Sequence, residues 1–285
     1  MTDAFAVYNG FFDRNATGND MNDRPEKAVK AVFFDIDGTL ISFRNHTMPE
    51  STRRALHALR ERGIRLYVAT GRSKMMMPFM DKYFRFDAYL TLNGQYCYGD
   101  TGVIRKKTID APVIATLKSL LAKRPFPCLF VEEDGMFLNY SDESVEALCR
   151  LIDHPVPPVT SIDRIGNDEI LQFVPFLKDG EEGFLAEALT QVEMTRSVPY
   201  CFDVLPAGGG KEVGMEAVLR QTGISPEETM AFGDGFNDMG MLSYAGIGVA
   251  MGQAHDPVKQ KADFVTKSVD EDGILHALRH FGVLP

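Results

Sequence analysis

The chain has 285 residues, a formal net charge of −10 and a hydrophobic fraction of 45%. Its length suits one large or two modest domains, and its acidity argues against nucleic acid as a partner, since nucleic-acid-binding proteins usually carry a basic face. The four cysteines show no CxxC spacing, and no apolar run approaches the roughly 20 residues of a membrane span, so we expect a cytoplasmic protein that does not enter the membrane.

Residues 1–28 are predicted to be a peripheral extension that is disordered or loosely attached, because residues 13–25 are polar and lack periodicity. From Ala31 onward short apolar runs alternate with helical patterns, which predicts βαβ units and a parallel sheet. The expected strands lie at residues 31–34, 64–69, 88–92, 228–232, 247–250 and 264–266, and the expected helices at 49–62, 213–221 and 273–281. The fold class is therefore α/β, with a core formed by residues 29–94 and 199–285.

The middle of the chain has a different pattern. Glycine-containing turns at residues 99–102 and 133–135 each separate two apolar stretches, which is typical of β-hairpins. Helices are expected at 111–122 and 181–190, with further strands at 170–175 and 201–205. We therefore predict an α+β domain, residues 95–198, inserted into the α/β core.

Four stretches of polar or glycine-rich sequence follow predicted strands of the core: Asp35-Ile36-Asp37, Thr70-Gly71, Asn93-Gly94 and Gly233-Asp234. In an open parallel sheet, ligands bind beyond the carboxyl ends of the strands. The four stretches are therefore expected to converge at one edge of the sheet.

The first of these stretches has the features of a phosphate-ester site. An ionised Asp35 can attack phosphorus without a base, and Asp37 can protonate the leaving alkoxide and later deprotonate water. Gly38 allows close approach of the backbone to phosphate, and Thr39 can donate its hydroxyl and N–H groups. The alternative interpretation is a loop cap or a calcium-type turn, which the preceding buried strand disfavours.

The second acidic stretch, residues 233–238, predicts a metal site. Several carboxylates beside a phosphate would repel one another, and Mg2+ with oxygen ligands would relieve that repulsion. Asp234 is the expected direct ligand, while Asp238 is expected behind it, holding a metal-bound water or orienting Lys211. Alternatively, Asp238 is an acid favoured by the helix dipole at a helix start.

Lys211 lies at the start of a predicted helix, where a cation opposes the helix dipole. A residue that is locally unfavourable in this way often has a functional role. Lys211 can bind phosphate and stabilise Asp35. The alternative is an exposed lysine beside a glycine-rich loop. Thr70, followed by Gly71, can bind the transferring phosphate or can act as a simple helix N-cap.

Together these motifs resemble the haloacid dehalogenase (HAD) superfamily over roughly residues 30–285, and Asn93-Gly94-Gln95 resembles the cap entry of its Cof-type sugar-phosphatase branch. The resemblance implies a Rossmann-like core with an inserted cap, Mg2+, and hydrolysis through an aspartyl-phosphate. It implies Asp35 as nucleophile, Asp37 as acid/base that also lends its carbonyl to the metal, and Asp234 as the remaining metal ligand. Asn237 would reach toward substrate or phosphate. Glu212 departs from the pattern, because this branch commonly has glycine there.

Two alternatives to a phosphatase remain at this stage. A phosphomutase of the same superfamily shares the motifs, and a non-catalytic sensor of a phosphorylated metabolite would share the fold. The intact Asp35, Asp37, Lys211 and Asp234 disfavour the sensor. The resemblance alone makes a small phosphorylated sugar the first expectation for the substrate, and the sequence does not indicate an oligomeric state.

Overall fold

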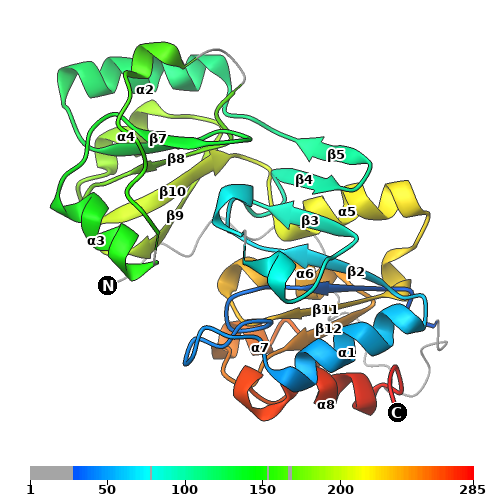
Figure 1. Cartoon of the computed structure of the whole chain (residues 1–285). Coiled ribbons are helices and arrows are strands. Elements are labelled where there is room, and N and C mark those ends of the chain that lie inside the picture. Colours follow the sequence, from blue (N-terminus) through cyan, green and yellow to red (C-terminus); the bar gives the residue numbers. More distant parts are fainter. Residues whose placement is uncertain (1–27, 78, 153, 166–168) are drawn as a thin grey trace.

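The computed structural model describes residues 28–285 except 78, 153 and 166–168, so the predicted extension at residues 1–28 lies almost wholly outside the described residues. The chain forms two β-sheets, each with its own helices, which lie next to each other (Figure 1). Within the described residues, no helix is long and apolar enough to cross a membrane.

The larger sheet has eight strands in the order β13-β12-β11-β1-β2-β3-β4-β5. The first six are parallel to one another, and β4 and β5 form an antiparallel hairpin at the edge next to β3. This confirms the predicted parallel sheet. The strand bounds are β1 Ala31–Phe34, β2 Arg65–Ala69, β3 Ala88–Thr91, β4 Tyr96–Gly99, β5 Gly102–Lys106, β11 Thr229–Gly233, β12 Ile247–Ala250 and β13 Phe264–Val265.

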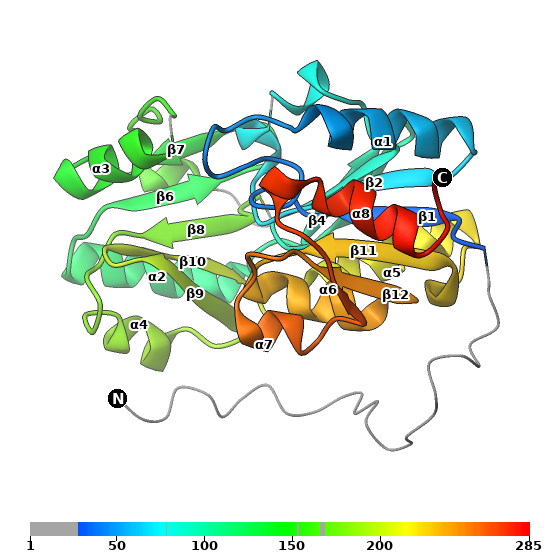
Figure 2. The ribbon, with the colours of Figure 1, turned by 90° about the horizontal axis from the view of Figure 1, so that it is seen from below.

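Strand β1 is central and fully buried, because successive side chains enter opposite hydrophobic clusters. Val32 and Phe34 pack in the cluster that includes α1 and α8, whereas Ala31 and Phe33 pack in the cluster that includes α5 and α6. Figure 2 shows these helices on the two faces of the sheet. The helix bounds are α1 Glu50–Glu61, α5 Lys211–Thr222, α6 Met239–Tyr244, α7 Asp256–Lys259 and α8 Gly273–His280.

The smaller sheet is antiparallel, with five strands in the order β7-β6-β8-β10-β9. One face packs against α2 and α4, and part of the other packs against α3. This inserted α+β unit is called the cap below. Its elements are α2 Ala111–Lys123, β6 Cys128–Val131, β7 Met136–Leu138, α3 Glu143–Leu151, β8 Gln172–Pro175, α4 Gly183–Ala188, β9 Val192–Val198 and β10 Cys201–Pro206.

The sheets do not follow the predicted domain boundaries at 94/95 and 198/199. The hairpin β4–β5, assigned to the cap from sequence, pairs with β3 in the larger sheet, while β10, assigned to the core, pairs with β8 and β9 in the cap. The chain leaves the larger sheet after Lys106 and returns after Pro206. Local pattern locates a strand, but its partner depends on long-range hydrogen bonding, and this explains the shift.

Helix α3 and strand β9 were not predicted. Helix α3 begins after Asp142, whose carboxylate accepts hydrogen bonds from the N–H groups of Ser144 and Val145. Strand β9 lies at the edge of the cap sheet and interleaves polar and apolar side chains, so it lacks the continuous apolar run of a buried strand.

A small buried cluster joins the cap to the core. Leu92 and Tyr96 from the core pack with Val131, Leu171 and Leu205 from the cap, and this set is called the interface cluster below. Beside it, buried Gln95 donates from Nε2 to the carbonyl oxygen of Pro206, 2.7 Å away, at the end of β10. The edge of the larger sheet is therefore bonded directly to the last strand of the cap.

Candidate active site

Strand β1 delivers Asp35 to the carboxyl end of the larger sheet. The N–H of Asp35 donates to the carbonyl oxygen of Phe232 at 3.0 Å, which extends the pairing with β11, and the residue is only 6% exposed. The chain then turns at Gly38, whose φ is +84°. A side chain on Gly38 would collide with Asp234 and with the ring of Phe43, so this turn requires glycine.

Lys211 is the first residue of α5 and is completely buried. Its Nζ donates to Asp35 Oδ1 at 2.6 Å and to Asp238 Oδ1 at 2.5 Å. Helix α5 therefore places a cation between two buried carboxylates that are far apart in the sequence. The exposed-lysine alternative is excluded, and the local conflict with the helix dipole is offset by two negative charges.

Burial shifts the proton affinities of these groups. Burial raises the pKa of Asp35 well above its ordinary value, while Lys211 opposes that rise and the charges of Asp238 and Asp37 add to it. Burial alone would lower the pKa of Lys211, but Asp238 and Asp35 outweigh it and raise this pKa. Lys211 is therefore a permanent cation, and it favours the ionised form of Asp35.

The loop after β11 carries Asp234 and Asp238. The second oxygen of Asp238 accepts hydrogen bonds from the N–H groups of Asp234, at 2.9 Å, and Gly235, at 2.8 Å. Both oxygens of Asp238 are thus occupied by Lys211 and by the loop backbone. Asp238 holds Lys211 in place and shapes the loop that presents Asp234.

Three carboxylates gather here. One oxygen each from Asp35, Asp234 and Asp238 lies within 4.8 Å of the others, the geometry of a possible metal site. Burial first, then the charge of Asp238, raises the pKa of Asp234 to about 6. A hard divalent cation with oxygen ligands fits this donor set. Asp35 and Asp234 are the members that remain available to coordinate it.

The side chain of Asp37 pairs with an arginine and is not part of that group. Arg72, on the loop after β2, binds it through two charge-assisted hydrogen bonds, Nε to Oδ2 and Nη2 to Oδ1, both 2.7 Å long. Such a paired, planar contact fixes the orientation of a carboxylate. Asp37 was predicted to lend its backbone carbonyl to the metal, and that prediction does not involve its side chain, which is not one of the three grouped carboxylates.

The remaining predicted residues line the same edge. Thr39 is buried and directs its hydroxyl toward Asp234 Oδ1 at 3.5 Å, and the Thr70 hydroxyl accepts the N–H of Arg72 at 3.1 Å, a local turn contact that leaves its own proton free to donate. A Cβ built on Gly71 would lie 3.6 Å from the amide nitrogen of Asn237. All the predicted loops therefore converge.

Three polar side chains at this edge had no predicted role, although Asn93 belongs to a stretch that was expected to converge there. Arg72 binds Asp37, Gln253 donates to Asp234 Oδ2 at 3.2 Å and also to the carbonyl oxygen of Gly38, and Asn93 accepts a hydrogen bond from Asn237 at 3.0 Å. Gln253 follows β12, and Arg72 and Asn93 follow β2 and β3. The strand-end rule that identified the other residues applies to these three as well.

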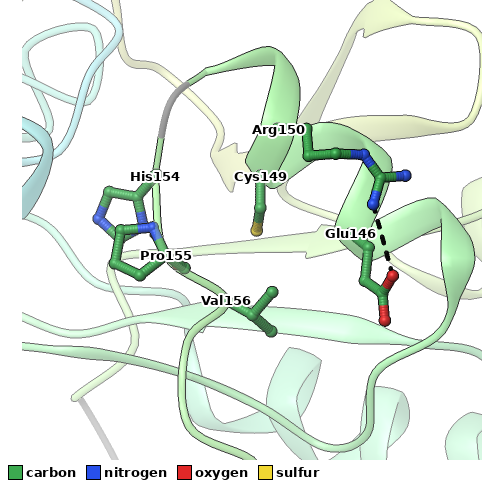
Figure 3. A pocket seen from close by; sticks show the side chains of 6 residues that line it. All are labelled: Glu146, Cys149, Arg150, His154, Pro155 and Val156. Carbon is green, nitrogen blue, oxygen red and sulfur yellow. Dashed lines mark hydrogen bonds and ion pairs between the residues drawn. The ribbon is translucent and has the colours of Figure 1, made fainter.

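A separate hollow of about 470 Å³ lies on the cap, at the end of α3 (Figure 3). Its walls carry an ion pair between Glu146 and Arg150 and the buried thiol of Cys149. It contains none of the residues that converge at the sheet edge, so it is distinct from the candidate active site.

Comparison with known proteins gives a consistent result. The family model described as haloacid dehalogenase-like hydrolase matches residues 32–278. The chain is 34% identical over 258 residues to "Putative phosphatase YkrA" of Bacillus subtilis (strain 168), covering 90% of this chain and 98% of the relative. It is 28% identical over 264 residues to the HMP-PP phosphatase of Yersinia enterocolitica, covering 87% of this chain and 93% of the relative.

Solved structures agree. The HAD subclass IIB sugar phosphatase BT4131 superposes with a TM-score of 0.79 at 39% identity, covering 90% of this chain and all of that one. BT1666 of Bacteroides thetaiotaomicron, described among phosphatases of the same superfamily, superposes with a TM-score of 0.81 at 33% identity, covering 97% and 100%. The similarity extends over both the core and the cap.

Proposed function

We propose, from the premise that this chain belongs to the haloacid dehalogenase-like hydrolase family, that it is a Mg2+-dependent phosphatase that hydrolyses a small phosphorylated metabolite through an aspartyl-phosphate on Asp35. The observation that carries this proposal is the buried arrangement of Lys211 between Asp35 and Asp238, with Asp234 beside them. A structural turn would not need a nucleophile, a buried cation and a group of carboxylates in one place.

The first half of the reaction forms the covalent intermediate. A carboxylate oxygen of Asp35 attacks phosphorus, and the bond between phosphorus and the ester oxygen of the leaving group breaks. Asp37 supplies the proton that the leaving alkoxide needs. Lys211 stabilises the charge that builds up beside Asp35, and the cation held by Asp35, Asp234 and the Asp37 carbonyl would neutralise phosphoryl oxygens when bound.

The second half releases inorganic phosphate. Asp37, now ionised, removes a proton from water, the water oxygen attacks phosphorus, and the bond to Asp35 breaks to restore its carboxylate. Gly38, Thr39, Thr70 and Gly71 surround the transferring group, and Asn237 faces the same loop. The bidentate contact with Arg72 suits this ionised, base form of Asp37.

A phosphorylated sugar is the substrate class we favour. This rests on the cap, whose Asp134 pairs with Lys74 of the loop after β2, and on the likeness to the sugar phosphatase BT4131. A small anionic metabolite also suits an acidic chain with a localised buried cation.

The test is release of phosphate from an aryl phosphate and from a panel of sugar phosphates, with and without Mg2+. We expect Mg2+-dependent release by the native chain and a loss of at least about 1,000-fold in Asp35→Asn, because an amide cannot attack phosphorus. Exposed Asp100→Asn is the matched control and should retain full activity. Full activity in Asp35→Asn would refute the nucleophile.

The same assay separates the phosphomutase alternative. A mutase keeps the phosphoryl group on its sugar and excludes water from the intermediate. Multiple turnovers of free phosphate from one sugar phosphate favour the hydrolase, whereas an isomeric sugar phosphate with little free phosphate would favour the mutase.

A further inference from the structure

The turn that follows β3 has an uncommon backbone. Leu92, Asn93 and Gly94 are all left-handed, with φ values of 51°, 51° and 80°. Glycine adopts this region freely and asparagine tolerates it, but leucine rarely does. Such conformations persist where surrounding contacts enforce them, and they concentrate at functional sites.

Backbone hydrogen bonds hold the turn against the catalytic loops. The N–H of Leu92 donates to the carbonyl oxygen of Arg72, and that of Asn93 to Thr70, both at 3.0 Å. The carbonyl oxygen of Asn93 accepts the N–H of Gly210, also at 3.0 Å, immediately before Lys211. The turn is thus hydrogen-bonded both to the start of α5 and to the loop after β2 that begins at Thr70. That loop is called the phosphate loop below.

The side chains of Leu92 and Asn93 make contacts in different parts of the molecule. Leu92 is 1% exposed and packs in the interface cluster with Leu171 and Leu205 of the cap. Asn93 Oδ1 instead accepts a hydrogen bond from Asn237 Nδ2 at 3.0 Å. A Cβ on Gly71 would lie 3.5 Å from that same Asn93 oxygen, so the paired amides adjoin the loop that begins at Thr70.

We propose that Asn93 is a positioning residue that holds the amide of Asn237 over the phosphate loop, and that the left-handed turn links this amide pair to the packing of the cap. The inference rests on the proposed function, in which Asn237 contacts the phosphorylated substrate. Asn237 is an exposed residue of the one-turn segment Phe236–Asp238, so a fixed partner lowers the conformational entropy that it loses when substrate binds.

Asparagine suits this position for two physical reasons. It adopts the left-handed conformation more readily than most residues with a side chain, and its amide is neutral beside a site for an anionic substrate. Aspartate could still accept the hydrogen bond from Asn237, but its charge would repel phosphate.

The experiment is a double-mutant cycle with Asn93→Gly, Asn237→Ala and the double variant. Asn93→Gly keeps the left-handed backbone and removes only the amide. We measure kcat and KM for p-nitrophenyl phosphate with Mg2+, the inhibition constant of inorganic phosphate, and the thermal midpoint. Each single variant should raise KM and the phosphate inhibition constant about fivefold, with a smaller change in kcat, and the double variant should be no worse than Asn237→Ala alone.

Two further variants complete the test. Gln191→Gly replaces another left-handed residue, with φ of 62°, at an exposed position in the cap, and its kinetics should match the native chain. Asn93→Asp should raise KM more than Asn93→Gly, because it adds a negative charge.

Multiplicative losses in the double variant, or native kinetics in Asn93→Gly, would overturn this inference while leaving the phosphatase intact. A lower thermal midpoint with unchanged KM would likewise show that Asn93 is only structural. If the native chain releases no phosphate from any substrate, the proposed function itself fails, and the role given to Asn237 fails with it.

Discussion

Lys211 shows at the scale of one residue how the site is assembled. A fully buried ammonium is strongly unfavourable alone, and here two carboxylates within 2.6 Å balance it. The pair Asp35 and Asp238 carries one more negative charge than Lys211 supplies, and Asp234 adds another. Lys211 therefore holds Asp35 in place, and the remaining net negative charge of the carboxylates suits a divalent cation.

Replacing this lysine should cost stability as well as activity. Lys211→Met leaves two buried carboxylates without a cation, so we expect a loss of about 3–5 kcal/mol in the free energy of unfolding at pH 7.5, measured by denaturant titration. The loss should be smaller at pH 5, because burial raises the pKa of Asp35 and this carboxylate then protonates more readily.

The matched variant adds Asp238→Asn to Lys211→Met. It removes one uncompensated charge and should recover part of the lost stability without restoring catalysis. An equal loss in the single and double variants would show that the charge of Asp238 is not what Lys211 balances.

At the scale of elements, β10 shows how one strand serves two environments. Phe202 and Val204 enter the cluster beneath α2 and α4, whereas Leu205 enters the interface cluster with the core. On the Leu205 side, Asp203 accepts a hydrogen bond from Gln172 Nε2 at 2.6 Å, and burial raises the pKa of Asp203 to about 6. A strand that joins cap to core therefore carries a partly buried acid.

That acid makes cap stability depend on pH. Because the folded-state pKa lies above the value of about 4 in an unfolded chain, the contribution of Asp203 is fully present below pH 4 and is lost as pH rises through 6. Asp203→Asn keeps the acceptor for Gln172 and should gain on the order of 2 kcal/mol at pH 7.5 but little at pH 4.5.

Thermal or denaturant unfolding at the two pH values measures this difference. Exposed Asp179→Asn, at the other end of the cap, is the control and should show no comparable pH-dependent gain. A gain in Asp203→Asn that is equal at both pH values would contradict the assignment of the shift to Asp203.

At the scale of the whole molecule, the interface cluster and a few polar contacts hold the cap against the core. Lys74 of the core pairs with Asp134 of the cap at 2.7 Å, and Lys106 with Glu133 at the same distance. These pairs are largely solvent-accessible, and such pairs contribute little stability. Apolar burial in the interface cluster is therefore the larger contribution.

We expect Leu171→Ala to lower the free energy of unfolding by about 2–4 kcal/mol, because Leu171 is 1% exposed and fills the interface cluster. Leu151→Ala is the matched control: this leucine is 64% exposed on α3, and its loss should change stability by less than about 0.5 kcal/mol. Equal effects in denaturant titration would show that the cluster does not hold the cap in place.

Much of the candidate site was predictable from sequence because the strands that carry it are parallel. Asp35, Thr70 and Asp234 follow buried strands whose carboxyl ends share one edge, so their convergence follows from the alternation of strands and helices. The same reasoning placed Asn93 at this edge and, applied more strictly, would also have found Arg72 and Gln253. The contacts that these residues make were not predictable, since each joins loops that are distant in the chain.

The sequence by itself determined the α/β core and the presence of an inserted unit, and it carries the prediction that Asp35 is the nucleophile, since each depends on local periodicity or on residue type at a strand end. Only the tertiary structure decided that β4 and β5 belong to the core and β10 to the cap, because an edge strand acquires its partner through long-range hydrogen bonds. It also decided the orientation of Asp37 toward Arg72 and of Asn93 toward Asn237. Those orientations depend on side chains brought together by folding, which no local pattern encodes.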